Sequence, residues 1–239
     1  AATQAFLGDR SSDSTPPLVT EVSVLLTDEL RRNDAVAEFD PLRGPTPLGT
    51  PIPKIIPRPQ TDFWVFAYGS LIWNPGFIVE ESQPVTLWGY HRRFCVRSTF
   101  YRGTEERPGL VVGLRPGGRV TGVVHRVAAR RADEVLSYLE DREFRHDGYR
   151  HITAATRPQS GGDAIRALTF VVPDNSHSFQ PLTEAEVAQI LAFSVGQNGT
   201  NAAYLFNLNQ GLRAAGIKPG ALERLERRVR ELQQQSPTR

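Results

Sequence analysis

The stretch FWVFAYGSLIW, residues Phe63–Trp73, holds five aromatic and four aliphatic residues and is interrupted only by a Gly-Ser pair. Its first part, Phe63–Ala67, has the composition of a buried β-strand. The interruption at Gly69 and Ser70 allows two interpretations. It is a tight turn between two elements of the core, or it is a place where backbone amides are exposed for a ligand to bind.

The composition sets broad limits on the class of protein. A chain of 239 residues can form one or two domains with a sizeable core, and 39% hydrophobic with 23% charged residues is usual for globular proteins. The net charge of +2 gives no indication of a nucleic-acid partner, and no segment is apolar over the length of a membrane span. A single cysteine excludes an internal disulfide. We therefore expect a cytoplasmic monomer that binds neither nucleic acid nor membranes.

The N-terminal quarter differs from the rest of the chain. Seven prolines lie between Pro41 and Pro59, and such a run favours extended backbone over a helix or a central strand. Residues 1–61 are therefore predicted to form a proline-rich arm or linker, with a possible short helix at Glu21–Phe39. Residues 62–235 are predicted to form the main domain, and 236–239 a tail.

Within the main domain, strand patterns come first and helix patterns dominate the end. The sequence RPGGR between two apolar runs predicts a turn. Thr183 with Glu186 three residues later forms a capping-box signature at the start of a helix. The predicted strands are Phe63–Ala67, Val85–Ser98, Gly109–Leu114, Val120–Val127, His151–Arg157 and Ala164–Pro173. These patterns predict an α+β domain with a small curved or barrel-like sheet flanked by helices.

One carboxylate falls on the apolar face of the predicted helix Arg131–Glu143. Ala132, Val135, Leu136 and Leu139 form a stripe with helical spacing, and the stripe continues to Glu143, whereas Glu134 falls on the opposite side. Burial disfavours the charged form of a carboxyl group, so the pKa of Glu143 should rise toward a range useful for proton transfer. Alternatively, the helix ends near Arg142 and Glu143 turns into solvent.

Five blocks of the sequence together resemble the ChaC-type γ-glutamylcyclotransferases, most closely the bacterial branch. They occur in the family's order and are FWVFAYGSLIWNPGF, GYHRRFCVRSTFYRGTEERPG, TGVVHRV, LEDREFRHDGY and GTNAAYLFNL. The resemblance implies a compact mixed β-barrel flanked by helices. It also implies cleavage of glutathione to 5-oxoproline (pyroglutamate) and cysteinylglycine without a metal or cofactor. The segment FRHD is longer and more basic than in short animal members, so other γ-glutamyl amino acids or amines stay open as substrates.

The resemblance also implies roles for individual residues. Glu143 is the expected general acid and base, and the loop of Tyr68, Gly69, Ser70 and Leu71 is expected to hold the head of the γ-glutamyl group with its backbone amides. Arg102 is a candidate partner for a substrate carboxylate, or else a surface arginine. Tyr149 and Tyr204 are candidate hydroxyl donors, or else aromatic residues of the core.

Rival interpretations give the same residues other roles. A cysteine hydrolase would use Cys95, but this thiol lies within a predicted strand, where a small buried thiol is common. A serine hydrolase would use Ser70, which lacks the Gly-x-Ser-x-Gly elbow, and the five histidines show no metal-like spacing. A regulatory protein that only binds γ-glutamyl compounds remains, although it would need no buried general base.

Overall fold

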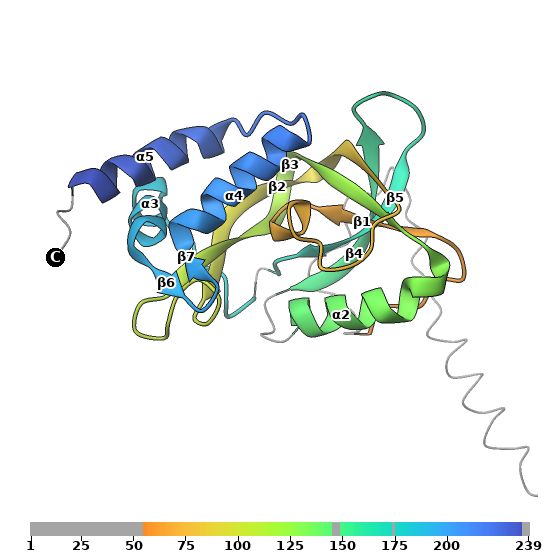
Figure 1. The fold of residues 1–239 in the computed structure, drawn as a ribbon, viewed down its shortest axis with the longest axis horizontal. Helices are drawn as coiled ribbons and strands as arrows, with labels where there is room; N and C mark the ends of the chain where they lie inside the picture. Colours follow the sequence, from red (N-terminus) through yellow and green to blue (C-terminus); the bar gives the residue numbers. More distant parts are fainter. Residues whose placement is uncertain (1–54, 145–148, 174, 236–239) are drawn as a thin grey trace, which may run out of the picture. The chain divides into compact units, whose positions relative to one another are not determined.

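The core of the structure is a closed barrel of five strands. The computed structural model describes residues 55–144, 149–173 and 175–235, which all lie in one compact unit. The strand order is β1-β3-β2-β4-β5, and parallel pairing of β5 with β1 closes the barrel (Figure 1). The strands are β1 (Phe63–Ala67), β2 (Glu81–Ser98), β3 (Gly109–Val127), β4 (Arg150–Pro158) and β5 (Ile165–Val171). The predicted α+β fold with a barrel-like sheet is confirmed.

The long strands β2 and β3 pair along almost their whole length, and this pairing corrects one prediction. The sequence RPGGR was expected to be a turn between two strands, but it lies inside the single strand β3. Gly117 and Gly118 have φ values of 97° and 73°, and the register between the two strands shifts between Trp88 and Tyr90. The two glycines therefore form an irregularity that bends a continuous strand, not a chain reversal.

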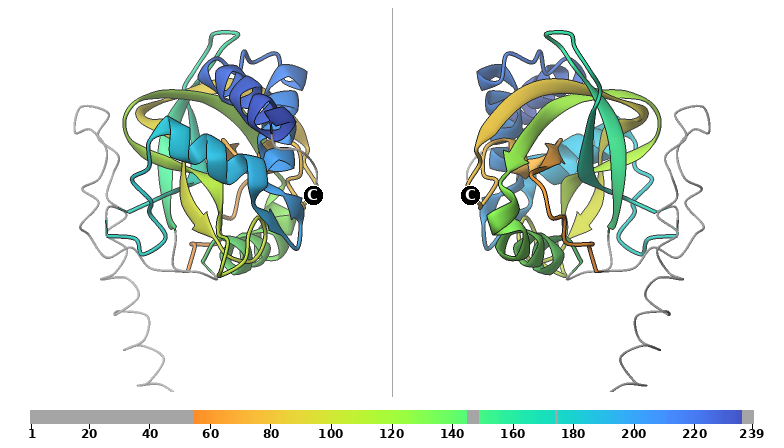
Figure 2. Two further views of the ribbon diagram at one scale, coloured as in Figure 1. Left: turned by 90° about the vertical axis from the view of Figure 1, so that its left-hand side faces the viewer. Right: turned by 90° about the vertical axis from the view of Figure 1, so that its right-hand side faces the viewer.

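Three helices pack against one another on one side of the barrel (Figures 1 and 2). These are α3 (Glu184–Phe193), α4 (Asn201–Ala214) and α5 (Ala221–Gln235), and a short ribbon of β6 (Val195–Gly196) and β7 (Gly199–Thr200) precedes α4. The predicted capping box is present, since Thr183 accepts from the backbone of Glu186 and the Glu186 side chain accepts from Thr183. Helix α5 buries Leu225, Val229 and Leu232 at helical spacing, so one apolar stripe attaches an otherwise charged helix.

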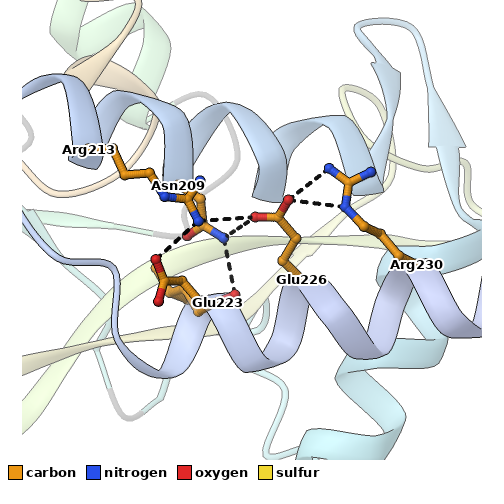
Figure 3. A network of polar contacts seen from close by, with 6 residues as sticks. Asn209, Arg213, Glu223, Glu226 and Arg230 are labelled. Atoms are coloured by element: carbon orange, nitrogen blue, oxygen red, sulfur yellow. Dashed lines mark hydrogen bonds and ion pairs between the residues drawn. The ribbon is translucent and has the colours of Figure 1, made fainter.

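Polar contacts add to the packing between α4 and α5 (Figure 3). Nδ2 of Asn209 donates to Oε2 of Glu226 at 2.7 Å, and Arg230 binds the other oxygen of the same carboxylate at 2.7 Å. One turn away, Arg213 reaches Glu223 at 3.1 Å. The contacts of Asn209 and Arg213 join α4 to α5, whereas Arg230 and Glu226 pair within α5. Tyr204, also on α4, belongs to the core of the barrel.

The helix that carries Glu143 lies elsewhere on the barrel. Helix α2 (Ala132–Phe144) follows the single 3-10 turn η2 (Ala129–Arg131) and buries the predicted stripe of Ala132, Val135, Leu136 and Leu139. Ile56 joins this cluster with 4% exposure, and its amide donates to Glu140 at 2.7 Å. Because the helix continues to Phe144, the alternative in which it ends near Arg142 is wrong.

Some expectations fall outside the described residues. The possible helix at Glu21–Phe39, most of the predicted arm and the tail 236–239 belong there. Among the described helices, none combines the length and the apolar character needed to cross a bilayer.

Candidate functional site

A cavity of about 600 Å³ opens between the β1–η1 loop, the end of β2, the last turn of α2 and the start of α4. Its walls come from segments that are far apart in sequence. The residues that the resemblance implied for catalysis and substrate binding all line it, namely Tyr68, Gly69, Ser70, Leu71, Arg102, Glu143, Tyr149 and Tyr204. The barrel and its helices therefore bring these eight candidates together in one place.

The loop Tyr68–Leu71 follows the buried strand β1 and turns at once into the 3-10 helix η1 (Ser70–Ile72). The Ile72 amide donates to the Gly69 carbonyl at 3.0 Å, which closes the turn. The amides of Gly69, Ser70 and Leu71 precede this bond, so the turn does not use them. Because these three residues also line the cavity, their amides are candidate donors for a ligand.

The space around the backbone requires glycine at position 69. A Cβ atom built on it would lie 2.8 Å from Cγ2 of Val112 and 3.0 Å from the hydroxyl of Tyr204. Any side chain would push into the wall of the cavity, so the close approach of the backbone depends on glycine.

Glu143 lies in the last turn of α2, and its side chain is only 13% exposed. Burial raises the pKa of the Glu143 carboxyl, and the charge of Arg142 opposes that rise. By contrast, Glu134 is 64% exposed and pairs with Arg131 at 3.0 Å across one helical turn. Glu143 and Glu134 therefore differ in burial as their positions on the helix predicted.

Arg142 was not singled out from the sequence, although it connects the two halves of the site. Its Nε lies 3.1 Å from Oε1 of Glu143, and its Nη2 donates to Oγ of Ser70 at 2.7 Å. Its Nη1 donates to the hydroxyl of Tyr138. One guanidinium thus links the carboxyl group of α2 to the loop after β1. An arginine next to an acidic residue is common on helices, so nothing local distinguished it.

Tyrosine side chains form much of the remaining wall. Tyr149 donates its hydroxyl hydrogen to the carbonyl of Val112 at 3.0 Å, and Tyr204 packs edge-on against Trp73 with ring centroids 5.3 Å apart. Burial raises the pKa of Tyr68, Tyr149 and Tyr204, so all three hydroxyls stay protonated at neutral pH. They are both packed aromatic residues and polar groups that line the cavity, so the two interpretations of these residues are compatible.

Arg102 lies at the rim formed by the end of β2 and the β6–β7 ribbon. Its Nη1 donates to the carbonyls of Asn198 at 2.6 Å and Thr200 at 3.2 Å. Its guanidinium carbon lies 5.4 Å from the centre of the Tyr204 ring. Arg102 is therefore anchored by the backbone of the ribbon while its charge faces the same cavity as Glu143.

The residues needed for the rival chemistries are placed differently. Cys95 is fully buried, and burial raises the pKa of its thiol to about 11, which keeps it protonated at neutral pH. The hydroxyl of Ser70 is bound by Arg142 instead of a histidine. Across the described residues, no group of three His, Cys, Asp or Glu side chains is arranged to hold a metal ion.

The arrangement suits the transfer of a proton within a bound, charged small molecule. A carboxyl group with a raised pKa can accept a proton from an amine and return it to a leaving group. Backbone amides and cationic side chains can hold the carboxylate of the same molecule.

Comparison with known proteins shows the family to which this chain is similar. The family described as "ChaC-like protein" matches residues 63–232. The glutathione-specific gamma-glutamylcyclotransferase of Escherichia coli (strain K12) is 37% identical over 176 residues, covering 71% of this chain and 73% of the relative. The glutathione-specific gamma-glutamylcyclotransferase of Schizosaccharomyces pombe is 36% identical, covering 65% and 85%. A crystal structure of a yeast gamma-glutamylcyclotransferase specific to glutathione superposes with a TM-score of 0.68 at 24% identity, covering 74% of this chain and all of that one.

Proposed function

The chain belongs to the family of ChaC-like proteins, and we propose that it is a γ-glutamylcyclotransferase that cleaves glutathione to 5-oxoproline and cysteinylglycine. The two relatives described above carry glutathione in their names, and this chain covers more than two thirds of each. We assign the reaction to the domain of residues 62–235. The cytoplasmic location and monomeric state expected from the sequence remain predictions.

The substrate of this reaction contains its own nucleophile. The α-amino nitrogen attacks the γ-carbonyl carbon, a C–N bond forms the five-membered lactam, and the bond to the cysteinyl nitrogen breaks. The ammonium group loses two protons in all and the departing nitrogen gains two, so no water or co-substrate is consumed. The protein has to fold the glutamyl chain and move protons, because a well-oriented intramolecular reaction already has an effective molarity on the order of 10⁵–10⁸ M.

Glu143 is the group that we propose for this proton transfer. An α-ammonium group has an ordinary pKa of about 8, so an acceptor is needed near neutral pH. Burial raises the pKa of Glu143, which strengthens the carboxylate as a base. The carboxylic acid formed when it takes the proton can return that proton to the leaving amine, which is the more basic group. The observation that carries the proposal is this buried carboxyl group in the same cavity as the loop Tyr68–Leu71.

We propose that the loop Tyr68–Leu71 binds the α-carboxylate of the γ-glutamyl group with its backbone amides. Because Gly69 has no side chain, the backbone can approach the carboxylate closely. Arg142 adds positive charge where it contacts Ser70. Arg102, which lines the same cavity, is a candidate partner for the carboxylate of the leaving group. Glutathione with an amidated α-carboxylate should therefore bind poorly, whereas glutathione that lacks only the α-amino group should bind and not react.

The direct test incubates the purified protein with glutathione and measures 5-oxoproline and cysteinylglycine. The expected result is release of both products in equal amounts, with the same rate in a chelator as without it. Binding of glutathione with no product would support the alternative of a regulatory binder. Faster release from other γ-glutamyl amino acids than from glutathione would keep the reaction and change the proposed substrate.

A further inference from the structure

Two side chains, the partly buried Arg92 and the buried His125, contact the loop Tyr68–Leu71 from the strands beneath it. Nε of Arg92, on β2, donates to the carbonyl of Tyr68 at the start of the loop. Nε2 of His125, on β3, lies 3.0 Å from the carbonyl of Leu71 at the end of the loop. A carbonyl can only accept, so Nε2 carries the hydrogen, and Nδ1 of His125 faces the hydroxyl of Ser82 at 2.8 Å.

The two inner carbonyls of the same loop are engaged by the turn that follows. The carbonyl of Gly69 accepts from Ile72 at 3.0 Å, and that of Ser70 accepts from Asn74 at 2.9 Å. Every carbonyl from Tyr68 to Leu71 therefore has a donor. Two of the four are fixed by local backbone contacts and two by side chains from distant strands.

These contacts set the direction of the amides. The peptide bonds are trans, and in a trans peptide the carbonyl and the next residue's N–H point in opposite directions. Because the Tyr68 carbonyl points toward Arg92, the N–H of Gly69 points away from Arg92. Fixing the Leu71 carbonyl on His125 orients the amide of Ile72, which closes the turn onto Gly69.

Removing the guanidinium of the partly buried Arg92 from water costs free energy. Burial lowers the pKa of its guanidinium to about 10, so the group is still charged at neutral pH. Nη2 donates to the carbonyl of Thr121 at 2.8 Å, and no carboxylate among the described residues forms an ion pair with it. A partly buried cation held only by backbone carbonyls is a costly arrangement for stability alone. Its charge lies directly behind the loop.

We propose that Arg92 and His125 are positioning residues for the loop that binds the substrate. Arg92 sets the direction of the Gly69 amide through the Tyr68 carbonyl, and His125 holds the turn that ends the loop through the Leu71 carbonyl and the Ile72 amide. The inference rests on the proposed function, because it assigns the amides to the glutamyl head of the substrate. Neither side chain lines the cavity, so neither is expected to touch the reacting atoms. Their loss should weaken binding in the ground state and in the transition state alike, which raises KM and leaves kcat nearly unchanged.

The test measures glutathione binding by calorimetry in a Glu143→Gln background, where the substrate should bind without reacting. Adding Arg92→Lys keeps the charge but leaves one nitrogen to serve two carbonyls. Adding His125→Phe keeps the ring and removes the donor. Each should weaken binding about tenfold or more. His125→Gln, which retains an N–H donor, should recover most of the affinity.

Arg93 provides a matched control on the same strand. It also donates to a backbone carbonyl, that of Leu182 at 2.6 Å, which does not line the cavity. Arg93→Lys should leave glutathione binding within about twofold of the Glu143→Gln protein, because it changes the same residue type in a contact away from the loop.

The outcomes separate this inference from the proposed function. If Glu143→Gln binds no glutathione and the unsubstituted protein releases no 5-oxoproline, the proposed function fails and the inference with it. If the melting temperature falls while Kd and, in the active protein, KM stay unchanged, the two residues only stabilise the fold and the inference is overturned. If Arg92→Lys does not fold, the test depends on His125. Equal glutathione Kd values for His125→Phe and His125→Gln would then overturn the inference.

Discussion

Arg142 and Glu143 are adjacent on α2, and their side chains form an ion pair with 3.1 Å between Nε and Oε1. The pair is largely buried, with 22% and 13% of the two side chains exposed. The two contributions to the pKa of Glu143 oppose each other, since burial raises it and the guanidinium lowers it. Arg142 therefore limits how far the carboxyl group departs from its ordinary pKa.

Replacing Arg142 should shift the pH dependence of turnover. Glu143 must be ionised to accept the proton, so kcat/KM should fall on the acid side as pH drops through its raised pKa. Arg142→Gln removes the contribution that lowers the pKa, so the acid limb should move to higher pH. The measurement is a profile of kcat/KM against pH for both proteins.

The control for this profile is Arg131→Gln on the same helix. Arg131 pairs with the exposed Glu134, so its removal should leave the acid limb in place. If the acid limb of Arg142→Gln stays at the same pH or moves to lower pH, the pKa of Glu143 does not set that limb.

Gly69→Ala should weaken substrate binding. The added Cβ would lie 2.8 Å from Val112 and 3.0 Å from the Tyr204 hydroxyl, so the loop or the wall must move. We expect a KM at least about tenfold higher, and a loss of stability of about 1–3 kcal/mol from overpacking. Steady-state kinetics and thermal unfolding measure the two effects.

Gly161→Ala is the matched glycine control. Gly161 has a φ of 85° and open space around it, so alanine should lower stability through backbone strain and leave KM unchanged. A normal KM for Gly69→Ala would show that substrate binding does not depend on a close approach of the backbone at Gly69.

Cys95→Ala should keep most of the activity. The thiol is fully buried beside Val96 and Val172, and burial raises its pKa to about 11, so it is neither accessible nor ionised at neutral pH. We expect kcat within about twofold of the unsubstituted protein and a stability loss of about 1 kcal/mol. A folded protein that loses turnover completely would restore the nucleophile interpretation.

The sequence predicted those parts of the fold that depend on local patterns. The apolar stripe of α2 and the Thr183–Glu186 capping box are both encoded within a few turns of helix. The sequence RPGGR was misjudged because glycines with positive φ suit a turn and an irregular strand equally well. Pairing with β2 decides between a turn and an irregular strand. The β2 residues involved, Trp88 and Tyr90, lie far from RPGGR in the sequence.

The same distinction applies to the site. Glu143 was singled out by its position on an amphipathic helix, which is a local property, together with its place in a block that resembles the family. Arg142, Arg92 and His125 were missed because their partners Ser70, Tyr68 and Leu71 lie 72, 24 and 54 residues away. These contacts exist only once the barrel has closed, so no local pattern could indicate them.

The central claim is that Glu143 transfers the proton that starts the cyclisation. Glu143→Gln keeps the size of the side chain and a polar group but cannot accept a proton from the ammonium group. The matched control is Glu134→Gln, because Glu134 lies on the same helix and is 64% exposed.

The most direct measurement is the rate of 5-oxoproline release from saturating glutathione by these two proteins, together with the Kd of glutathione. We predict a loss of about 10²–10⁴-fold or more in kcat for Glu143→Gln with binding retained, and no loss for Glu134→Gln. A kcat for Glu143→Gln close to that of the unsubstituted protein would contradict the account.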